Sequence, residues 1–360
     1  MKIILDNRQI HKQLFPFTKT RHAADIRVGI LTINEKFLFS NKHEVFRSYE
    51  DYAEKYPAEK EQTLQLPANI IADENGIEEM LANAKTLADG GFLIEEGVSL
   101  KILNHPWDIF KHNDWALRKD FELITKRRNS QPIPTSNKTI NNADIFIEAG
   151  AKLEHCILNA TDGPIYIGKN ATIMEGSLIR GPVAICEGAV VKMGTRIYGA
   201  TTIGPFCMVG GEIKNSVLFG YSNKAHDGYL GDSVLGEWCN LGAGTSNSNL
   251  KNTAGEVKYW CDAEQKQTGA GNKGGLLMGD YSKAAINTSF NTGTMVGVCC
   301  NVFAAGLTPT YIPDFCWGTD GTTKYKLDKA LADIDNWKKL KGLTISDKEK
   351  QILTDIYTQF

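Results

Sequence analysis

The sequence has 360 residues, which is long for a single hydrophobic core, and its 42% hydrophobic and 23% charged residues exclude a disordered chain. The formal net charge of −2 argues against a nucleic-acid binder that depends on neutralising phosphates. No apolar run approaches the ~20 residues that span a bilayer, and the apolar start at residues 2–5 is too short for a signal peptide, so we expect a cytoplasmic protein.

The first part of the chain is predicted to be α/β. Strand-like apolar runs cover residues 2–5, 27–33 and 92–96, and an amphipathic helical pattern covers residues 77–88. A further helical stretch at 105–128 is predicted to connect this region to the glycine-rich segment that follows it.

A six-residue repeat starts at Ile167. Every sixth residue is a β-branched aliphatic, and the residue four places after each one is small. This pattern is typical of a parallel β-helix, in which the aliphatic side chains stack inside the coils and the small residues fit at the corners. The aliphatic positions are Ile167, Ile173, Ile179, Ile185, Val191, Ile197, Ile203 and Val209, and the pattern resumes at Leu235, Leu241, Met278, Ala284, Phe290, Val296 and Val302.

Two breaks interrupt the repeat, at residues 210–230 and 250–277. Insertions in a solenoid project from its surface and often line a binding site, so we expect the polar, glycine-rich second break to form a loop that contributes to a site. A disordered excursion is the alternative. Three cysteines fall on small-residue positions and are expected to be buried packing thiols, namely Cys207, Cys239 and Cys300.

The end of the chain is predicted to be helical. Residues 308–321 indicate a loop or an edge segment, and helices are expected at 325–340 and 347–359. The second helix opens with a capping box formed by Ser346 and Glu349. Terminal helices of this kind can cap one end of a solenoid and shield its open strand edge.

The first break in the repeat carries the chemically most unusual residues. His226 has Asp227, Tyr229 and Asp232 close by in the sequence. An unprotonated histidine suits general-base catalysis near neutral pH. A surface histidine, or one held by structural hydrogen bonds, is the alternative interpretation.

This stretch resembles the acetyltransferase domain of GlmU, the bifunctional enzyme that makes UDP-N-acetylglucosamine. That family carries K-A-G-H, Y-L-G-D and N-x-G-A-G-T motifs followed by an asparagine. The corresponding segments here are Asn-Lys-Ala-His at 223–226, Tyr-Leu-Gly-Asp at 229–232, Asn-Leu-Gly-Ala-Gly-Thr at 240–245, and Asn249.

The resemblance implies a left-handed β-helix, a homotrimer with active sites between subunits, and acetyl-CoA as cosubstrate. It implies His226 as the general base and Asn249 as the residue that contacts the substrate amine. The implied sugar-phosphate ligands are Arg196, Lys214, Tyr229 and Asn240, and the implied acetyl-CoA contacts are Ala243, Asn287 and Ala305. Where the family often has a serine near the acetyl group, this chain has Ile286.

The start of the chain is similar to sugar nucleotidyltransferases in fragments only. Residues 14–37 resemble their L-x-P-x-T segment, and 105–110 resemble the joint before their β-helix. No glycine precedes Gly29, so the glycine-rich loop that cradles nucleotide phosphates is missing. Cationic side chains would have to replace that loop, and the candidates are Arg8, Lys12, Lys19, Arg21 and Arg27.

The fold class expected is therefore mixed. We predict a shortened α/β nucleotidyltransferase-like domain with its helical connector at 1–130, a left-handed β-helix at 140–318 and C-terminal helices at 319–360. The leading functional hypothesis is an acetyl-CoA-dependent N-acetyltransferase acting on an amino-sugar 1-phosphate, with glucosamine 1-phosphate as the favoured substrate. The alternatives are a sugar-1-phosphate nucleotidyltransferase, which alone would require Mg²⁺, and a catalytically silent sugar-nucleotide-binding scaffold. No protein metal site, nucleic-acid partner or membrane partner is expected.

Overall fold

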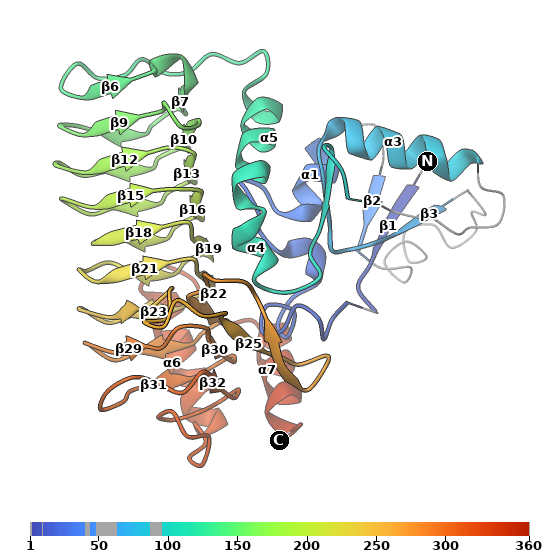
Figure 1. The fold of residues 1–360 in the computed structure, drawn as a ribbon, viewed down its shortest axis with the longest axis vertical. Helices are drawn as coiled ribbons and strands as arrows, with labels where there is room; N and C mark the ends of the chain where they lie inside the picture. The colour runs from blue at the N-terminus through green and yellow to red at the C-terminus, as the bar shows by residue number, and fades with distance from the viewer. Residues whose placement is uncertain (1, 9, 40–43, 48–62, 87–95, 360) are drawn as a thin grey trace.

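A long β-helix stands beside a smaller α/β region in the computed structural model, with two helices at the end of the chain (Figure 1). The structure describes residues 2–8, 10–39, 44–47, 63–86 and 96–359. The parallel β-helix that the repeat predicts is confirmed, because its strands pair in parallel on three faces. Among the described helices, none has the length and apolar character needed to cross a membrane.

Each face of the β-helix is one parallel sheet. The nine-stranded sheet contains β7 (Ile145–Ile147), β10 (Ile165–Ile167), β13 (Val183–Ile185), β16 (Thr201–Ile203), β19 (Val217–Gly220), β22 (Val234–Glu237), β27 (Leu276–Met278), β30 (Thr294–Val296) and β32 (Tyr311–Ile312). The eight-stranded sheet contains β8 (Lys152–Leu153), β11 (Thr172–Ile173), β14 (Val190–Val191), β17 (Met208–Val209), β20 (Asn223–Lys224), β23 (Asn240–Leu241), β28 (Lys283–Ala284) and β31 (Asn301–Val302). The six-stranded sheet contains β6 (Lys138–Ile140), β9 (Ile157–Asn159), β12 (Leu178–Arg180), β15 (Arg196–Tyr198), β18 (Glu212–Lys214) and β21 (Tyr229–Gly231), and the pair β24 (Ser246–Asn247) and β29 (Ser289–Phe290) lies beyond it.

The interior of the β-helix is the stacked aliphatic row that the repeat predicts. The eight positions from Ile167 to Val209 are at most 2% exposed and belong to one core cluster. Cys207, Cys239 and Cys300 are buried free thiols, as expected. Burial raises the pKa of the Cys207 thiol to about 12, so this cysteine stays protonated and packs as an apolar side chain.

The first break in the repeat is a change of spacing within continuous coils. Strands β18, β19, β20 and β21 continue the three faces through residues 210–230. The inward positions now fall at Ile213, Leu218, Lys224 and Leu230, all of them buried. The interval from Val209 to Ile213 is four residues instead of six, because the corner between them is shorter.

The second break contains an ordered hairpin, which overturns the alternative of a disordered excursion. Strands β25 (Lys258–Cys261) and β26 (Lys266–Gly269) pair antiparallel. The ring of Tyr259 is fully buried and stacks on Trp107 at 5.3 Å between ring centroids. The hairpin therefore packs between the β-helix and the α/β region (Figure 1).

The α/β region is built on a small parallel sheet. Strand β1 (Lys2–Asp6) lies between β2 (Glu44–Phe46) and β3 (Thr63–Pro67). Strands β4 (Ile70–Ala72) and β5 (Leu100–Ile102) pair antiparallel, and the helices are η1 (Ala23–Asp25), α1 (Ile33–Phe39) and α3 (Glu74–Thr86). The strand at 2–5 is thus confirmed, and so is the helix expected at 77–88 as far as residue 86. Residues 87–88, and most of the strand expected at 92–96, lie outside the described residues.

The strand expected at residues 27–33 is wrong. The chain turns back on itself at Gly29, which has φ +81°, and α1 begins at Ile33. The carboxylate of Asp120 accepts hydrogen bonds from the backbone N–H groups of Ile30 and Leu31, at 2.8 and 3.0 Å. A partner about ninety residues away therefore stabilises a turn that local strand propensity does not favour.

The helical connector expected at 105–128 is confirmed as α4 (Asp108–Lys111) and α5 (Asn113–Thr125), and α5 runs along the nine-stranded sheet (Figure 1). The side chain of Asn113 donates to the carbonyl of Ala200 at 2.8 Å and accepts from the N–H of Gly29 at 2.7 Å. One buried amide thus joins the connector to both the β-helix and the α/β region. The short helix η2 (Asn142–Asp144) follows at the start of the coils.

The C-terminal helices are α6 (Leu327–Lys339) and α7 (Asp347–Thr358), and the predicted capping box at Ser346 is present. Strand β32 adds the expected edge segment to the nine-stranded sheet. The helices pack on Trp238, Tyr281, Cys299 and Phe315, which follow one another along the corner between the nine- and eight-stranded sheets. They therefore cover the side of the β-helix, because these four residues form an apolar stripe there. The position expected for them was the end of the β-helix.

Candidate active site

His226 lies at the corner between the eight- and six-stranded sheets, which we call the site corner. It follows β20 by two residues and precedes β21 by three. Its side chain is exposed, and its imidazole has no hydrogen-bond or ion-pair partner within the part of the chain that the structure describes. The imidazole is therefore accessible to a substrate.

Two cations lie next to this corner on the outer surface of β15, β18 and β21, which we call the site face. Arg196 and Glu212 are partners across β15 and β18, and Tyr198 and Lys214 are the next such pair. Arg196 lies 3.8 Å from Glu212, between Nε and Oε2, and its side chain remains 49% exposed. The ammonium of Lys214 lies 5.5 Å from the centre of the Tyr198 ring. Both cations thus remain accessible to an anionic ligand.

Tyr229 and Asn249 form the other half of the site face. The Asn249 side-chain amide donates to the Tyr229 hydroxyl at 3.0 Å and to Asp232 Oδ2 at 2.5 Å. The other oxygen of Asp232 accepts from the Asn215 amide at 2.6 Å. Burial, followed by the nearby Asp232 carboxylate, raises the pKa of the Tyr229 hydroxyl, which therefore keeps its proton. Asp232 orients Asn249, a role that its position in the Tyr-Leu-Gly-Asp motif does not reveal.

The three residues expected to contact acetyl-CoA lie along the site corner on the coils after His226. The N–H of Gly244 donates to the carbonyl of Asp227 at 3.1 Å, and the N–H of Asn287 donates to the carbonyl of Ala243 at 2.8 Å. Ala305 follows β31 at the same corner and is exposed. The line of the site corner through Ala243, Asn287 and Ala305 forms a ridge. The side chain of Ile286, which is 69% exposed, projects from this ridge. The ridge is therefore more apolar at this point than one with a serine.

Asn240 is the one expected sugar ligand that lies on a different face. It belongs to β23 of the eight-stranded sheet, where it is paired with Asn223 and Lys283. Its surroundings are a groove of about 570 Å³ between that sheet and the end of α6, where Trp337 and Leu340 are among the lining residues. Within one chain, the structure does not bring Asn240 together with the site face.

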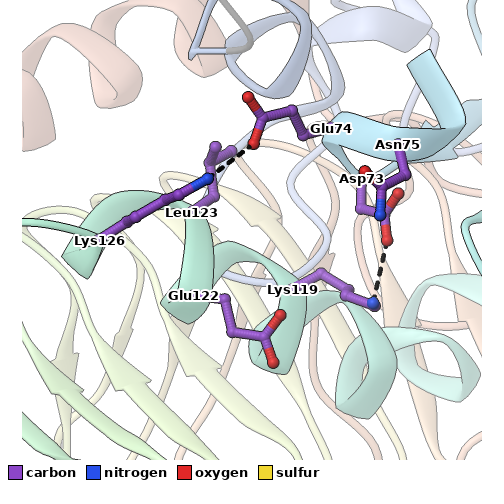
Figure 2. Close-up of a pocket in the computed structure, with 7 residues that line it drawn as sticks. All are labelled: Asp73, Glu74, Asn75, Lys119, Glu122, Leu123 and Lys126. Carbon is purple, nitrogen blue, oxygen red and sulfur yellow. Dashed lines mark hydrogen bonds and ion pairs between the residues drawn. The ribbon is translucent and has the colours of Figure 1, made fainter. Parts of the chain in front are cut away.

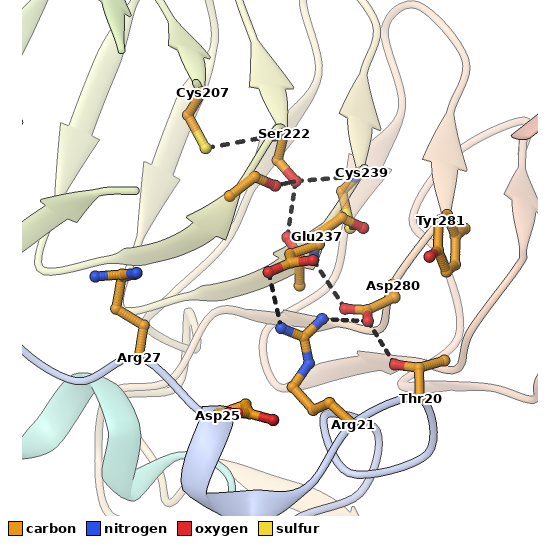
Figure 3. A network of polar contacts seen from close by, with 12 residues as sticks. Thr20, Arg21, Asp25, Arg27, Cys207, Ser222, Glu237, Cys239, Asp280 and Tyr281 are labelled. Carbon is orange, nitrogen blue, oxygen red and sulfur yellow. Dashed lines mark hydrogen bonds and ion pairs between the residues drawn. The ribbon is translucent and has the colours of Figure 1, made fainter. Parts of the chain in front are cut away.

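Two of the five cations expected to bind nucleotide phosphates, Lys19 and Arg21, instead pair with carboxylates of the β-helix. Figure 3 shows Arg21 between Glu237 and Asp280 of the β-helix. Its guanidinium lies 3.1 Å from Glu237 Oε1 and also pairs with Asp280 Oδ2, which accepts a further bond from the Thr20 hydroxyl at 2.5 Å. Lys19 lies 3.7 Å from Asp314. These side chains therefore join the α/β region to the β-helix.

A second pocket, of about 370 Å³, lies between the start of α3 and α5 (Figure 2). Lys119 pairs with Asp73 at 3.0 Å, and Lys126 pairs with Glu74 at 3.4 Å. Both lysines are thus matched by carboxylates of the pocket itself. Among the described residues, no group of three or more histidine, cysteine, aspartate or glutamate side chains is placed to hold a metal ion.

Comparison with known proteins finds similarity to a nucleotidyltransferase family and to GlmU proteins. The family model described as "Sugar nucleotidyl transferase" matches residues 2–97 and 83–129. GlmU of Methanococcus maripaludis is 28% identical over 233 residues, which cover 64% of this chain and 50% of that protein. The "Bifunctional sugar-1-phosphate nucleotidylyltransferase/acetyltransferase" of Sulfurisphaera tokodaii is 28% identical over 164 residues, covering 40% of this chain and 41% of that protein. The chain thus spans half or less of the length of these curated relatives.

A solved structure, the acetyltransferase domain of PglB from Neisseria gonorrhoeae, matches 87% of this chain and 96% of its own, with 10% identity and a TM-score of 0.17. The match to the sugar nucleotidyl transferase family thus lies in the α/β region and its helical connector, ahead of the parallel β-helix. The chain is thus similar to GlmU proteins over part of their length.

Proposed function

We propose that this protein is an acetyl-CoA-dependent N-acetyltransferase acting on an amino-sugar 1-phosphate, with glucosamine 1-phosphate as the favoured substrate, in the synthesis of UDP-N-acetylglucosamine or a related nucleotide sugar. The observation that carries the proposal is the site face, where two accessible cations lie beside an exposed histidine. Arg196 and Lys214 would bind the sugar phosphate through charge-assisted hydrogen bonds. Tyr229 and Asn249, oriented by Asp232, would contact the sugar and its amine.

The chemistry that follows is a direct acyl transfer. The substrate ammonium must lose a proton before it can act as a nucleophile, and His226 would accept that proton. The amine nitrogen would then attack the thioester carbon, a backbone N–H of the site corner would stabilise the oxyanion, and the carbon–sulfur bond would break. The nitrogen would lose its second proton to solvent as the carbon–sulfur bond breaks, and the thiolate would take up the proton held by His226. The products are an N-acetyl sugar phosphate, the thiol of coenzyme A and one proton.

The ridge of the site corner is where acetyl-CoA would lie in this proposal. Ala243, Asn287 and Ala305 follow one another down the ridge from His226, with Ile286 near the acetyl end. Asn240 lies on the adjacent face, so it would reach the same sugar only from another copy of the chain. The homotrimer implied by the GlmU-like family would supply that copy. We also propose that the chain consists of three parts. They are the α/β domain with its connector at 1–130, the β-helix at 140–318 and the C-terminal helices at 319–360.

Nucleotidyl transfer in the α/β region is the second candidate function, because residues 2–129 match the sugar nucleotidyl transferase family. It would need Mg²⁺ to neutralise the nucleotide phosphates. Lys19 and Arg21 are already paired with carboxylates of the β-helix, which favours acetyl transfer as the leading proposal. A silent sugar-nucleotide-binding scaffold is the third candidate.

The proposal is tested by offering the full chain acetyl-CoA together with either glucosamine 1-phosphate or glucosamine. Released thiol and the mass of the acetylated sugar are measured. We expect acetylation of the phosphorylated sugar and at least ~10-fold lower kcat/KM for glucosamine, since a hydrogen bond to a charged group contributes roughly 1.5–3 kcal/mol. Equal rates for the two amines would contradict the role of the site face, and no thiol release from either would contradict acetyl transfer.

A further inference from the structure

Lys224 occupies an inward position of the β-helix, where the repeat places apolar residues. It is paired with Val209 across β17 and β20, and its side chain is 1% exposed. The other inward positions of the same sheet are all apolar, namely Leu153, Ile173, Val191, Val209, Leu241, Ala284 and Val302. A lysine in such a row is costly to bury unless its ammonium is hydrogen-bonded.

The ammonium of Lys224 lies directly inside the site corner. Its Nζ donates to the backbone carbonyl of His226 at 2.7 Å and to that of Gly210, on the preceding coil, at 3.1 Å. Burial lowers the pKa of Lys224 to about 8, while Asp227 raises it and Arg196 lowers it further. At neutral pH the donor is therefore still largely charged, and its bonds to the two carbonyls are charge-assisted.

Other corners of the same kind are closed by a hydroxyl. At these corners, the residue four places after the inward position carries a side-chain hydroxyl. This hydroxyl donates to the backbone carbonyl of the residue directly after the inward position. Ser177 bonds Met174 at 2.7 Å, Thr195 bonds Lys192 at 2.5 Å and Thr288 bonds Ala285 at 2.8 Å. The hydroxyl is small enough to fit inside the coil and donates to a carbonyl at the corner. Lys192 and Ala285 also accept from a hydroxyl of the preceding coil, namely from Ser177 and Thr245, each at 3.1 Å.

The coil that carries His226 has no such hydroxyl. Gly228 stands at the equivalent position, and a Cβ there would lie 2.1 Å from the carbonyl oxygen of Thr245, so no side chain fits. The preceding corner, at Gly210 and Gly211, is the shortened one and also carries no hydroxyl. Lys224 thus reaches from the interior to the Gly210 carbonyl, the position that a corner hydroxyl bonds elsewhere, and also to the His226 carbonyl, one residue beyond that position on its own coil.

We propose that Lys224 is a positioning residue for His226: its ammonium fixes the two backbone carbonyls inside the site corner and so sets the direction of the imidazole outside it. The catalytic part of this inference rests on the proposed acetyl transfer. The positioning itself concerns the free protein and can be tested without substrate.

The kinetic test compares Lys224→Met with Ile173→Ala, a control in the same inward row three coils away. We expect Lys224→Met to lower kcat at least 10-fold while the KM values for acetyl-CoA and glucosamine 1-phosphate change less than 3-fold. Ile173→Ala, which weakens the core without touching the site corner, should keep kcat within 3-fold of the wild type. A Lys224→Met variant with the kcat of the control would overturn a role in the reaction.

The structural test is the NMR signal of the His226 ring, identified by its loss in His226→Ala. We expect this signal to shift or split in folded Lys224→Met and to stay in place in Ile173→Ala. An unchanged His226 signal overturns the positioning whatever the activity. A shifted signal in a protein whose wild type has no acetyltransferase activity supports the positioning and contradicts only the proposed function.

Lys224→Gln covers the case in which Lys224→Met does not fold, because its amide keeps N–H donors on a shorter side chain. We expect the chemical shift of the His226 ring in this variant to lie between that of the wild type and that of an imidazole free to rotate. We expect kcat to fall 3- to 10-fold. Wild-type kcat together with a wild-type His226 signal in Lys224→Gln would overturn the proposal.

Discussion

The site face and the interface between the α/β region and the β-helix place the same kinds of cations in opposite situations. Arg196 and Lys214 lie on an open sheet surface, where an incoming phosphate can reach them. Lys19 and Arg21 lie at a closed interface, where carboxylates of the β-helix already pair with them. Figure 3 shows the pairing of Arg21. Arg21 is 10% exposed and its partner Asp280 is 3% exposed, so neither charge is available to solvent.

The difference teaches that a cation in a family motif does not by itself make a phosphate site. If a buried guanidinium moves away from its carboxylates, the carboxylates stay buried without a cation, which strongly destabilises the folded protein. A half-exposed arginine loses only a weak, solvent-screened ion pair when it turns to a ligand. The motif that resembles a nucleotide-binding segment is thus used here to dock two parts of the molecule.

The largest effect is expected from His226→Ala. Loss of a general base lowers kcat for acetyl transfer by about 10²–10⁴-fold, because proton transfer contributes roughly that much. The side chain is exposed, so folding should be unaffected, and circular dichroism with the melting midpoint checks this. Near-wild-type thiol release by a folded variant would mean that another base or another function operates.

The next effect is expected from Arg21→Ala, which leaves Asp280 buried without its cation. We expect the free energy of unfolding to fall by about 3–5 kcal/mol, the usual cost of breaking a buried pair. Arg180→Ala is the matched control, since Arg180 and Asp162 form an ion pair in which both side chains are 54% exposed. It should cost about 0–1 kcal/mol. Equal losses in the two variants by urea denaturation would show that the interface does not depend on Arg21.

A pH-dependent effect is expected from Asp314, the partner of Lys19. Burial raises the pKa of this carboxyl to about 6 from its ordinary value of 3.8, even though Val298 donates to it. Since the folded state binds this proton more tightly than the unfolded state, the group's contribution to stability is present below about pH 4 and is lost as the pH rises through 6. The stability of the wild type relative to Asp314→Asn should therefore fall by about 2–3 kcal/mol between pH 4 and pH 7. A difference that stays constant over this range in urea denaturation would contradict it.

The smallest effect is expected from Lys214→Ala. Removing one of two cations from the site face should raise KM for glucosamine 1-phosphate about 10-fold and leave KM for acetyl-CoA unchanged, in line with roughly 1.5 kcal/mol for a charged hydrogen bond. Arg180→Ala, on the same sheet but one coil beyond Arg196, should leave both values unchanged. An equal rise for both substrates would indicate a general disturbance of the sheet.

The β-helix could be predicted from the sequence because its determinant is local. A six-residue period in aliphatic residues repeats over many coils, so each position is supported by the next. The six-residue period could not predict the inward position of Lys224. The shortened corner shifts the register of the repeat, and the period places apolar residues inside the coils. The signal that could have indicated it is Gly228, which takes the place of a corner hydroxyl two residues after His226.

The α/β region was harder to predict, since its determinants lie far away in the sequence. Residues 27–33 have strand propensity, but Asp120 bonds the backbone of a turn there. The pairing of Arg21 with Asp280 joins positions 259 residues apart, which no local pattern indicates. For the candidate site, the side chains of Tyr229 and Asn249, which the motif groups together, are hydrogen-bonded, whereas the motif gives no hint that Asn240 lies on another face.

The most direct test of the account measures two activities in one reaction. The full chain is given acetyl-CoA, UTP, Mg²⁺ and glucosamine 1-phosphate, and released thiol and pyrophosphate are followed together, with dTTP and N-acetylglucosamine 1-phosphate in parallel. We expect thiol release at ~1 s⁻¹ or more, within the ordinary range for enzymes, and pyrophosphate release at least ~10²-fold slower. Pyrophosphate release at ~1 s⁻¹, or no thiol release, would contradict the claim that the cations of the site face bind substrate while Lys19 and Arg21 join the α/β region to the β-helix.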